Sequence, residues 1–492
     1  MTFLMVVELL VVLVTLWIGA RYGSLALGAI SGIGLAILVF GFHLKPGTPP
    51  TDVIYIIIAA VTCAGMLQAS GGMDWMLQIA ERILRKHPDR ITLLAPFVTF
   101  FLTILVGTGH VVYTLMPIIC DIALKKGIRP ERPCAIASVS SQIGITCSPI
   151  AAAVVAFSAI SAEHGFEVTN VQIVMLCIPA CVIGILMAIL YSYRRGLDLD
   201  KDPEFQKRIA DPVQREHIYG GSATTLDKEI SRESKRAVFI FLGALGVILF
   251  VSLLLMFGWD IRPGYPSVSE IKGGPAKIEI ADGVSISAKQ LASAGVVVPE
   301  MTEKKKRRMA MSLLIQIAMI SAAGLMIIFC KAKPKAAMSG AVWQNGMVAV
   351  VAIYGIAWMS NTYFDNYQQE MKDMLTGIVS AYPWSIAFAF FAVSVLINSQ
   401  GAVVVSMLPL AYGLGIEGWV LVGVLPSVYG YFFIPNYPSD IATVNFDRSG
   451  TTVIGKYLLN HSFMAPGLIH VVCATIAGLG ISWVYHFVFK LY

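Results

Sequence analysis

Hydrophobic residues in this chain form long continuous runs instead of alternating with polar positions. Several runs approach or reach the roughly 20 residues that a helix needs to cross a bilayer. They are Leu25–Phe40, Val53–Leu67, Val171–Leu190, Ala237–Met256 and Met311–Ile328. A soluble core would instead show apolar positions at regular spacing between polar ones. We therefore predict an all-α polytopic membrane protein.

Two apolar stretches are interrupted by glycine and polar residues in the same way. The stretch "VGTGHVVYTLMP" begins at Val106 and "NSQGAVVVSMLP" begins at Asn398, so that Gly109 matches Gly401. Non-helical backbone at membrane depth is tolerated only where it is buried in protein or lines a water-filled cavity. We predict that both interruptions are the tips of re-entrant helical hairpins near the centre of the protein.

A second pair of segments indicates an internal repeat. The stretch "ASVSSQIGITCSPIA" can be aligned with "PSVYGYFFIPNYPSD" so that Pro149 meets Pro438, and both stretches carry residues that break helices. Two opposite-facing copies of a fold with broken helices are typical of secondary transporters. We predict a first inverted repeat over residues 1–195 and a second over 237–492.

The composition agrees with a membrane location, because 57% of the residues are hydrophobic, 13% are charged and the mean hydropathy is +0.73. The net charge of +6 does not indicate nucleic-acid binding, since Lys and Arg gather in short loops as the positive-inside rule requires. This rule places the linker at 196–236 in the cytoplasm. The polar loop at about 259–308 then faces outside, although its "KKKRR" at 304–308 opposes the rule. The eight cysteines lack metal-ligand spacing, and we expect packed thiols.

The tips and breaks should bring helix N-termini to one centre, where free N–H donors and partial positive charge suit carboxylates. We expect the side chains of Thr108, Ser148, Asn398, Ser399 and Asn436 to hold the carboxylates of a substrate. The rest of the predicted substrate site consists of Gly109, His110, Pro149, Gln400, Gly401, Pro438, Ser439 and Asp440. We predict no catalytic residue and no metal ligand.

Two ionisable residues of this set have more than one possible role. His110 could relay a proton, bind substrate or hydrogen-bond a carbonyl within the bundle. Asp440 falls in the first turn after the "PNYPSD" break, where it could cap its helix, coordinate a cation or organise the substrate site. For the acids Asp74, Asp365 and Asp447, which lie near predicted helix ends, we expect solvated side chains.

Over nearly its whole length, the chain resembles the Dcu family of anaerobic C4-dicarboxylate transporters from bacteria. The resemblance rests on the ordered segments "GAISGIGLAILVF", "LQASGGMDWMLQIAERILRKHP", "GTGHVVYTLMPII", "RPERP", "GLDLDKDPEFQK", "VAIYGIAWM", "NSQGA", "YPSD" and "FDRSGTTVIGKYLLNHSF". The forms "GTGHVVYTLMP" and "KDPEFQK" most resemble the fumarate–succinate antiporter branch. The chain departs from the family pattern at Asn436, where a "PTYPSD" run would carry Thr, and in the longer loop at 259–308.

The resemblance implies a multi-pass exchanger of the bacterial inner membrane that imports fumarate, malate or aspartate and exports succinate. It also implies kinship with the ion-transporter superfamily, whose members work by an elevator motion and usually form homodimers. Membrane lipids and a membrane sensor kinase are further partners that the resemblance implies. No cofactor is expected, apart from a co-transported proton or sodium ion.

Other functions remain open from the sequence. A proton- or sodium-coupled C4-dicarboxylate symporter would use the same interrupted helices. A membrane receptor subunit for dicarboxylates, a membrane-embedded enzyme or an anion channel fits less well. The linker at 196–236 is too short and charged for a folded signalling domain, and the chain contains no phosphate loop, zinc-ligand cluster or nucleophile elbow.

Overall fold

The computed structural model of the 492-residue chain consists mainly of helices. It describes residues 3–22, 25–49, 51–220, 223–256, 259–269, 277–281, 284–287, 303–375, 382–397, 399–434, 437–455 and 460–492. The helices before the linker are α1 (Phe3–Tyr22), α2 (Leu25–Ala36), η1 (Ile37–Gly41), α3 (Thr51–Ala69), α4 (Gly72–Lys86), η2 (Pro88–Arg90), α5 (Ile91–Val106), η3 (Gly109–Val111), α6 (Val112–Lys125), α7 (Glu131–Ile143), η4 (Gly144–Cys147), α8 (Ala152–Glu163) and α9 (Asn170–Tyr193).

The linker contains two short helices, and the remaining elements follow it. The linker helices are α10 (Pro203–Ile209) and α11 (Pro212–Tyr219). The later elements are α12 (Arg232–Met256), β1 (Gly264–Ser269), β2 (Lys277–Ala281), β3 (Val284–Ser287), β4 (Glu303–Arg308), α14 (Met311–Cys330), α15 (Pro334–Ser339), α16 (Ala341–Leu375), η5 (Pro383–Ser385), α18 (Ile386–Leu396), α19 (Gln400–Gly413), α20 (Gly418–Val424), η6 (Leu425–Val428), α21 (Pro438–Phe446), α22 (Met464–Trp483) and η7 (Val484–Val488).

Within the described residues, seven helices are long and apolar enough to cross a membrane, and a bent pair raises the number to eight. The bent pair is α3 and α4, whose axes differ in direction by 73°. The bend falls at Gly71, which adopts a left-handed φ of 74° that few other residues tolerate. The multi-pass membrane protein predicted from the hydrophobic runs is thus confirmed.

Both predicted interruptions of helices are present. The helix α5 ends at Val106 because Gly107 follows with a left-handed φ of 79°, and η3 then leads into α6. In the second half, α18 ends at Leu396 and α19 begins at Gln400, with the Ser399 hydroxyl accepting a hydrogen bond from the backbone N–H of Ala402. A serine at this position satisfies one of the free N–H groups of a helix start.

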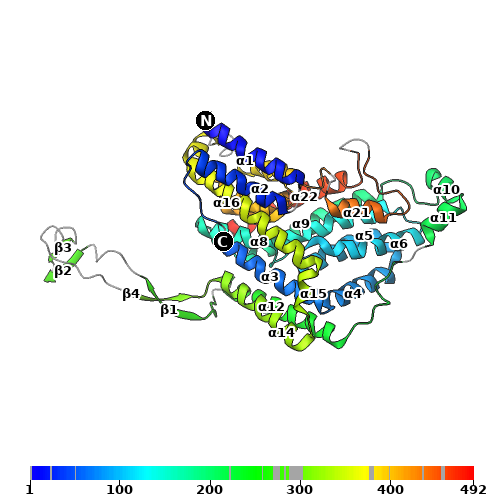
Figure 1. Ribbon diagram of the computed structural model, residues 1–492, viewed down its shortest axis with the longest axis horizontal. Coiled ribbons are helices and arrows are strands. Elements are labelled where there is room, and N and C mark those ends of the chain that lie inside the picture. Colours follow the sequence, from blue (N-terminus) through cyan, green and yellow to red (C-terminus); the bar gives the residue numbers. More distant parts are fainter. Residues whose placement is uncertain are drawn as a thin grey trace.

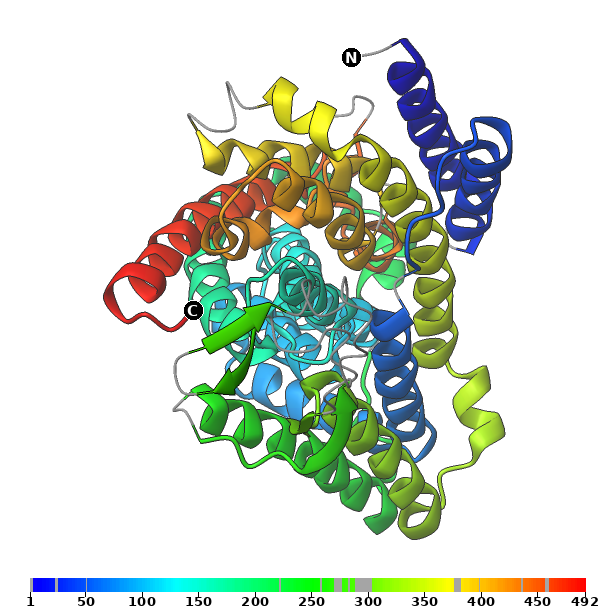
Figure 2. The same cartoon turned by 90° about the vertical axis from the view of Figure 1, so that its left-hand side faces the viewer.

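Elements of the two halves pack against each other in matching pairs. The helix α9 packs along α22, α2 packs on α16 as α3 packs on α14, and α8 contacts α19 as α6 contacts α21. Within each half, α1 packs on α2 and α12 packs on α14. Figure 1 shows these helices as one elongated bundle, and Figure 2 shows α1 and α2, in blue, at its edge.

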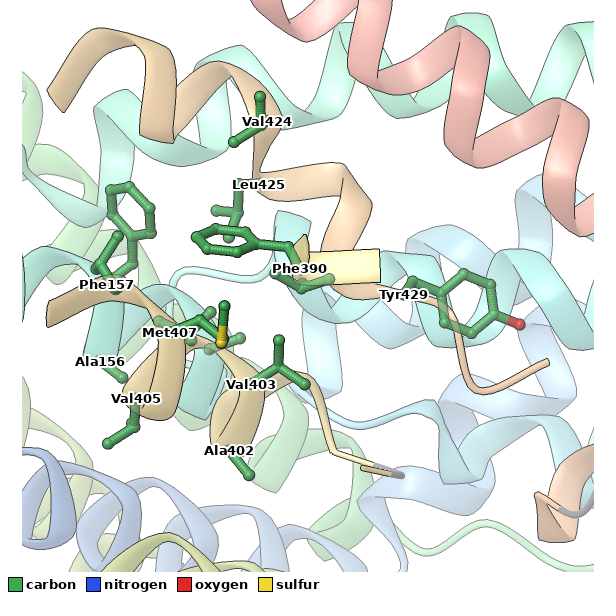
Figure 3. Close-up of a cluster of buried hydrophobic side chains, with 14 of the residues drawn as sticks. Ala156, Phe157, Phe390, Ala402, Val403, Val405, Met407, Val424, Leu425 and Tyr429 are labelled. Atoms are coloured by element: carbon green, nitrogen blue, oxygen red, sulfur yellow. The ribbon is translucent and has the colours of Figure 1, made fainter. Parts of the chain in front are cut away.

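A hydrophobic cluster joins the two halves beside the interrupted helices. Phe157 of α8 lies with Phe390 of α18, Val403 of α19 and Leu425 of η6, all fully buried (Figure 3). The ring of Tyr429 lies at the edge of this cluster, and its hydroxyl oxygen is directed away from the apolar side chains (Figure 3). These contacts hold the start of α19 close to the segment that leads into α8.

The prediction of an all-α fold is confirmed for the membrane-spanning body but not for the loop at 259–308. The described part of that loop forms two antiparallel ribbons, β1 with β4 and β2 with β3. The "KKKRR" run lies in β4, where Arg308 pairs with Gly264. These ribbons project from one end of the bundle, while α10 and α11 of the linker lie at the opposite end (Figure 1).

Candidate functional site

The first hairpin tip, residues 107–110, places Thr108 and His110 side by side. The Thr108 Oγ1 atom lies 2.5 Å from the His110 Nδ1 atom and accepts a longer hydrogen bond, 3.4 Å, from the His110 backbone N–H. Both side chains are half-buried. The hydrogen-bond partner of Nδ1 is thus a hydroxyl. The predicted alternative in which His110 hydrogen-bonds a backbone carbonyl therefore does not hold for this nitrogen. Binding of substrate and transfer of a proton stay predictions.

Gly109 of the first tip lies directly against the end of α7. Its carbonyl oxygen accepts a hydrogen bond of 2.7 Å from the Ser141 hydroxyl. A Cβ atom placed on Gly109 would lie 2.6 Å from both Oε1 and Nε2 of Gln142. A larger side chain here would have to displace the Gln142 amide, which also accepts a hydrogen bond from the Tyr431 hydroxyl.

The second tip, residues 398–401, contacts both the end of α7 and the start of α8. The Nε2 atom of Gln400 donates a hydrogen bond of 2.8 Å to the backbone carbonyl of Gln142. A Cβ atom on Gly401 would lie 3.2 Å from the Cβ of Ala152 at the start of α8. Ser399 is half-buried and caps α19. Asn398, which we predicted to bind carboxylate, lies outside the described residues.

The first break contains Ser148 and Pro149, between η4 and α8. The Pro149 carbonyl accepts a hydrogen bond of 2.9 Å from the Asn170 amide at the start of α9. Ser148 is fully buried, and a Cβ atom on Gly107 would lie 3.6 Å from its Oγ. The first break and the first tip therefore adjoin, as the prediction of a single centre requires.

The second break brings Ser439 and Asp440 against α7. The helix α21 begins at Pro438, which is exposed, and Asp440 lies in its first turn with only 1% of its surface exposed. The Ser138 hydroxyl lies 2.7 Å from Oδ1 of Asp440 and 3.3 Å from the Ser439 hydroxyl. Within the described part of the chain Asp440 forms no ion pair. Asn436, also predicted to bind carboxylate, lies outside the described residues.

Three polar residues on one face of α7 connect the tips and breaks, and they were not among the site residues predicted from the sequence. Ser138, Ser141 and Gln142 lie at helical positions i, i+3 and i+4, so their side chains share a face. Ser138 hydrogen-bonds Asp440 of the second break, and Ser141 hydrogen-bonds Gly109 of the first tip. Gln142 contacts both tips. The signal for them was the polar run "SVSSQ" within an apolar stretch of 33 residues, Glu131–Glu163.

Several buried polar atoms on α7, after η6 and at the tips and breaks lack a hydrogen-bond partner among the described residues. They are the Oγ atoms of Ser140 and Ser148, Oε1 of Gln400 and the hydroxyl oxygen of Tyr429. A buried polar atom without a partner costs about 1–3 kcal/mol, and a polar ligand that supplied the missing partner would remove this cost. Across the described residues, no group of three or more His, Cys, Asp or Glu side chains could hold a metal ion.

Two expectations outside the site can be compared with the structure. The prediction that Asp447 is solvated is wrong: it is 4% exposed, and its carboxylate accepts hydrogen bonds from the backbone N–H groups of Ser449 and Thr452 at 3.0 and 2.6 Å. The loop after α21 folds around this carboxylate, which satisfies its charge. Asp365 is exposed, as predicted. The eight cysteines carry free thiols and seven are buried, so the prediction of packed thiols is confirmed.

Comparison with known proteins agrees with the resemblance found in the sequence. A family model described as anaerobic C4-dicarboxylate membrane transporter matches residues 4–486. The chain is 42% identical over 487 residues to the anaerobic C4-dicarboxylate transporter DcuB of Escherichia coli O6:H1, which covers 98% of this chain and 100% of that protein. It is 31% identical over 467 residues to the C4-dicarboxylate transporter DcuA of Wolinella succinogenes, which covers 95% and 96% of the two chains.

Among solved structures, MtrF of Neisseria gonorrhoeae, described with a class of antimetabolite efflux pumps, superimposes with a TM-score of 0.49 at 11% identity. The superposition covers 97% of this chain and 98% of MtrF. The matched family model and the two named relatives span nearly the entire sequence, and they describe transporters, not enzymes. The chain therefore belongs to the DcuA/DcuB family of anaerobic C4-dicarboxylate membrane transporters.

Proposed function

We propose that this transporter exchanges C4-dicarboxylates across the bacterial inner membrane, with fumarate, malate or aspartate entering and succinate leaving. The observation that carries the proposal is the set of buried polar atoms without partners on α7, after η6 and at the tips and breaks. Three of them, on Ser140, Ser148 and Tyr429, are hydroxyl groups whose hydrogens no described residue accepts. A hydroxyl donates readily to a carboxylate, so these groups suit a ligand that carries carboxylates.

The electrostatics of the centre favour binding by dipoles. No Lys or Arg occurs in the four segments 107–117, 138–153, 399–413 and 429–446. The helix starts of α8, α19 and α21 supply free N–H groups and partial positive charge instead. The carboxylate of Asp440 adds negative charge, and a proton or sodium ion bound beside it would offset the charge of a dianion.

We also propose that residues 1–195 and 237–492 are inverted repeats with re-entrant hairpins, and that transport follows an elevator-type alternating-access motion. The matching pairs of packed helices support this, as do the prolines at equivalent places in α6 and α19. Both Pro117 and Pro409 lie inside a helix eight residues after the matching glycine, Gly109 or Gly401. Such repeats are the usual architecture in which substrate sites form at the membrane centre.

The orientation and the partners follow from the same proposal. The linker at 196–236 faces the cytoplasm and the ribbons at 264–308 face the periplasm. This orientation is supported by the position of these two parts at opposite ends of the bundle (Figure 1). Homodimer formation in the lipid bilayer and association with a membrane sensor kinase belong to the proposal only through the family resemblance. Residues 1–195 and 237–492 would then cross the membrane with opposite topology.

Counterflow in proteoliposomes tests the exchange. Purified protein is reconstituted with unlabelled succinate inside, and labelled fumarate, malate, aspartate or succinate is added outside, with and without sodium or a pH gradient. Uptake that requires internal dicarboxylate supports exchange. Uptake into empty vesicles that an ion gradient drives would instead identify a symporter, and absence of uptake in all conditions would refute dicarboxylate transport.

The placement of the site is tested by Thr108→Ala and Ser399→Ala in the same assay. Both side chains are half-buried at the tips, and their loss should weaken uptake without lowering the amount of protein in the membrane. Ser339→Ala is the matched control, because this exposed serine on α15 bonds only its own helix. Transport equal to the control in both tip variants would exclude these residues from the site.

A further inference from the structure

The side-chain amide of Gln400 is held by a ring of hydrogen bonds that joins the two halves of the chain. Its Nε2 atom lies 2.8 Å from the backbone oxygen of Gln142 and 3.3 Å from the hydroxyl oxygen of Tyr431. That hydroxyl in turn lies 3.1 Å from Oε1 of Gln142. The three residues are 3%, 2% and 1% exposed, in the order Gln400, Gln142 and Tyr431.

The ring permits only one orientation of the Gln400 amide. A backbone carbonyl can only accept a hydrogen bond, so the group that faces the Gln142 oxygen must be the NH₂ of Gln400. The second hydrogen of this NH₂ points to the Tyr431 oxygen, and the Tyr431 hydrogen is then directed to Oε1 of Gln142. The amide oxygen of Gln400 consequently lies on the opposite edge of the amide.

This oxygen is a buried acceptor that the protein itself does not use. Oε1 of Gln400 has no hydrogen-bond donor in the part of the chain that the structure describes. The neighbouring residue in the tip, Ser399, is half-buried, whereas Gln400 is only 3% exposed. A ligand enclosed at the tip would be the source of the missing donor.

The chemistry of an acceptor distinguishes among C4-dicarboxylates. Fully ionised succinate and fumarate carry only acceptors, whereas a hydroxyl or ammonium group at C2 supplies a donor. We propose that Gln400 is a specificity-determining residue that favours C4-dicarboxylates with a 2-hydroxy or 2-amino group over unsubstituted ones. This inference rests on the proposed function, because it assumes that the tips enclose the transported dicarboxylate. A site built to hydrogen-bond such a group discriminates against a substrate that leaves the acceptor unpaired.

The test compares substrates within each of four proteins: the unmodified chain, Gln400→Met, Tyr431→Phe and the control Gln344→Met. Methionine keeps the length of the side chain but removes the amide oxygen, and Gln344 is an exposed glutamine in the first turn of α16. Tyr431→Phe removes one partner of the NH₂ but leaves the Gln142 carbonyl, which still orients the amide. Counterflow of labelled succinate is inhibited with unlabelled malate, aspartate, fumarate or succinate, and the half-inhibiting concentrations are compared as ratios.

For Gln400→Met we expect the preference for malate and aspartate relative to succinate to fall about tenfold, which corresponds to about 1.4 kcal/mol. Tyr431→Phe and Gln344→Met should leave the ratios unchanged, even if Tyr431→Phe weakens all four ligands together. Equal weakening of every ligand in Gln400→Met would overturn the proposal and reduce the ring to a structural role. Absence of succinate counterflow in the unmodified protein would refute the proposed function itself, and the two failures are therefore distinguishable.

Discussion

The packing of Gly109 against Gln142 makes Gly109→Ala the sharpest test of how the first tip is built. Gly109 lies in the short 3-10 helix η3, a conformation that alanine adopts without strain. The substitution therefore acts only through the added methyl group. That group would lie 2.6 Å from the polar atoms of the Gln142 amide and 2.7 Å from its Cδ, so the amide must move by several tenths of an ångström.

The expected magnitude follows from the contacts that the amide makes. Overfilling a packed interior costs about 1–3 kcal/mol. A displaced Gln142 amide also loses the 3.1 Å hydrogen bond from Tyr431, worth about 0.5–1.5 kcal/mol. We expect a lower melting temperature and a reduction of counterflow by about tenfold or more, since every 1.4 kcal/mol corresponds to about tenfold.

Two further glycines provide a graded series. At Gly401 the added Cβ would meet Ala152 at 3.2 Å, so a smaller loss is expected. At Gly324 in α14 no described atom lies within 4 Å of the added Cβ, and Gly324→Ala should be neutral. The assays are thermal unfolding of the purified protein and counterflow in proteoliposomes. If Gly109→Ala unfolded and transported like Gly324→Ala, the contact with Gln142 would be refuted as the reason for glycine.

A double-substitution cycle separates the clash from other effects of the methyl group. Gln142→Ala removes the amide that the methyl group meets, at the cost of its own hydrogen bonds. In that background Gly109→Ala should cause little additional loss, because the space is vacant. Additive losses would show that the two residues do not act through contact.

Three other predictions concern buried polar groups. Ser138→Ala should lower the free energy of unfolding by about 1–3 kcal/mol, because it removes the 2.7 Å hydrogen bond that Ser138 donates to buried Asp440. Ser140→Ala should not lower it, since the Ser140 hydroxyl has no partner among the described residues. Thermal unfolding measures both. Asp447→Asn should lower the melting temperature by loss of the carboxylate that organises its loop; an unchanged value would contradict this role. Burial lowers the pKa of His461 below its ordinary value of 6.5. The folded state therefore has its full stability above pH 6.5, where the ring is neutral, and loses stability as the pH falls below that value. In His461→Gln the melting temperature should depend less on pH between about 5 and 7.

Much of the membrane architecture could be predicted from the sequence because it depends on local physics. Three of the five long apolar runs, Val171–Leu190, Ala237–Met256 and Met311–Ile328, became helices long enough to span, since a bilayer forces backbone groups to bond within each segment. The run Val53–Leu67 became the first half of a bent pair, and Leu25–Phe40 became a shorter apolar helix. The glycines at Gly107 and Gly71 end helices through left-handed backbone angles that the sequence makes easy. The strands at 264–308 were not foreseen. Lys277–Ala281 and Val284–Ser287 do alternate between apolar and polar residues, but each is only four or five residues long, at the lower limit of the pattern that indicates a strand.

The sequence drew attention to the tips and breaks but not to the residues of α7 that contact them. The glycines, serines and the acid at the tips and breaks stand out because such residues are poorly suited to lipid. Ser138, Ser141 and Gln142 lie inside a segment that reads as a continuous spanning helix. Nothing local in the sequence states which of its faces meets the second half of the chain, so their contacts with the tips could not be derived.

The sequence by itself determined that this is a multi-pass membrane protein of the DcuA/DcuB family with two interrupted helices, because hydropathy and glycine placement are local properties. Only the tertiary structure decided that Gln142 meets both tips, that Ser138 reaches Asp440 and that Asp447 is buried. The contacts of Gln142 with Gln400 and of Ser138 with Asp440 join residues that are some 260 to 300 positions apart. The burial of Asp447 depends on how the loop after α21 closes around it. They arise from the packing of whole helices, and no short stretch of sequence encodes that packing alone.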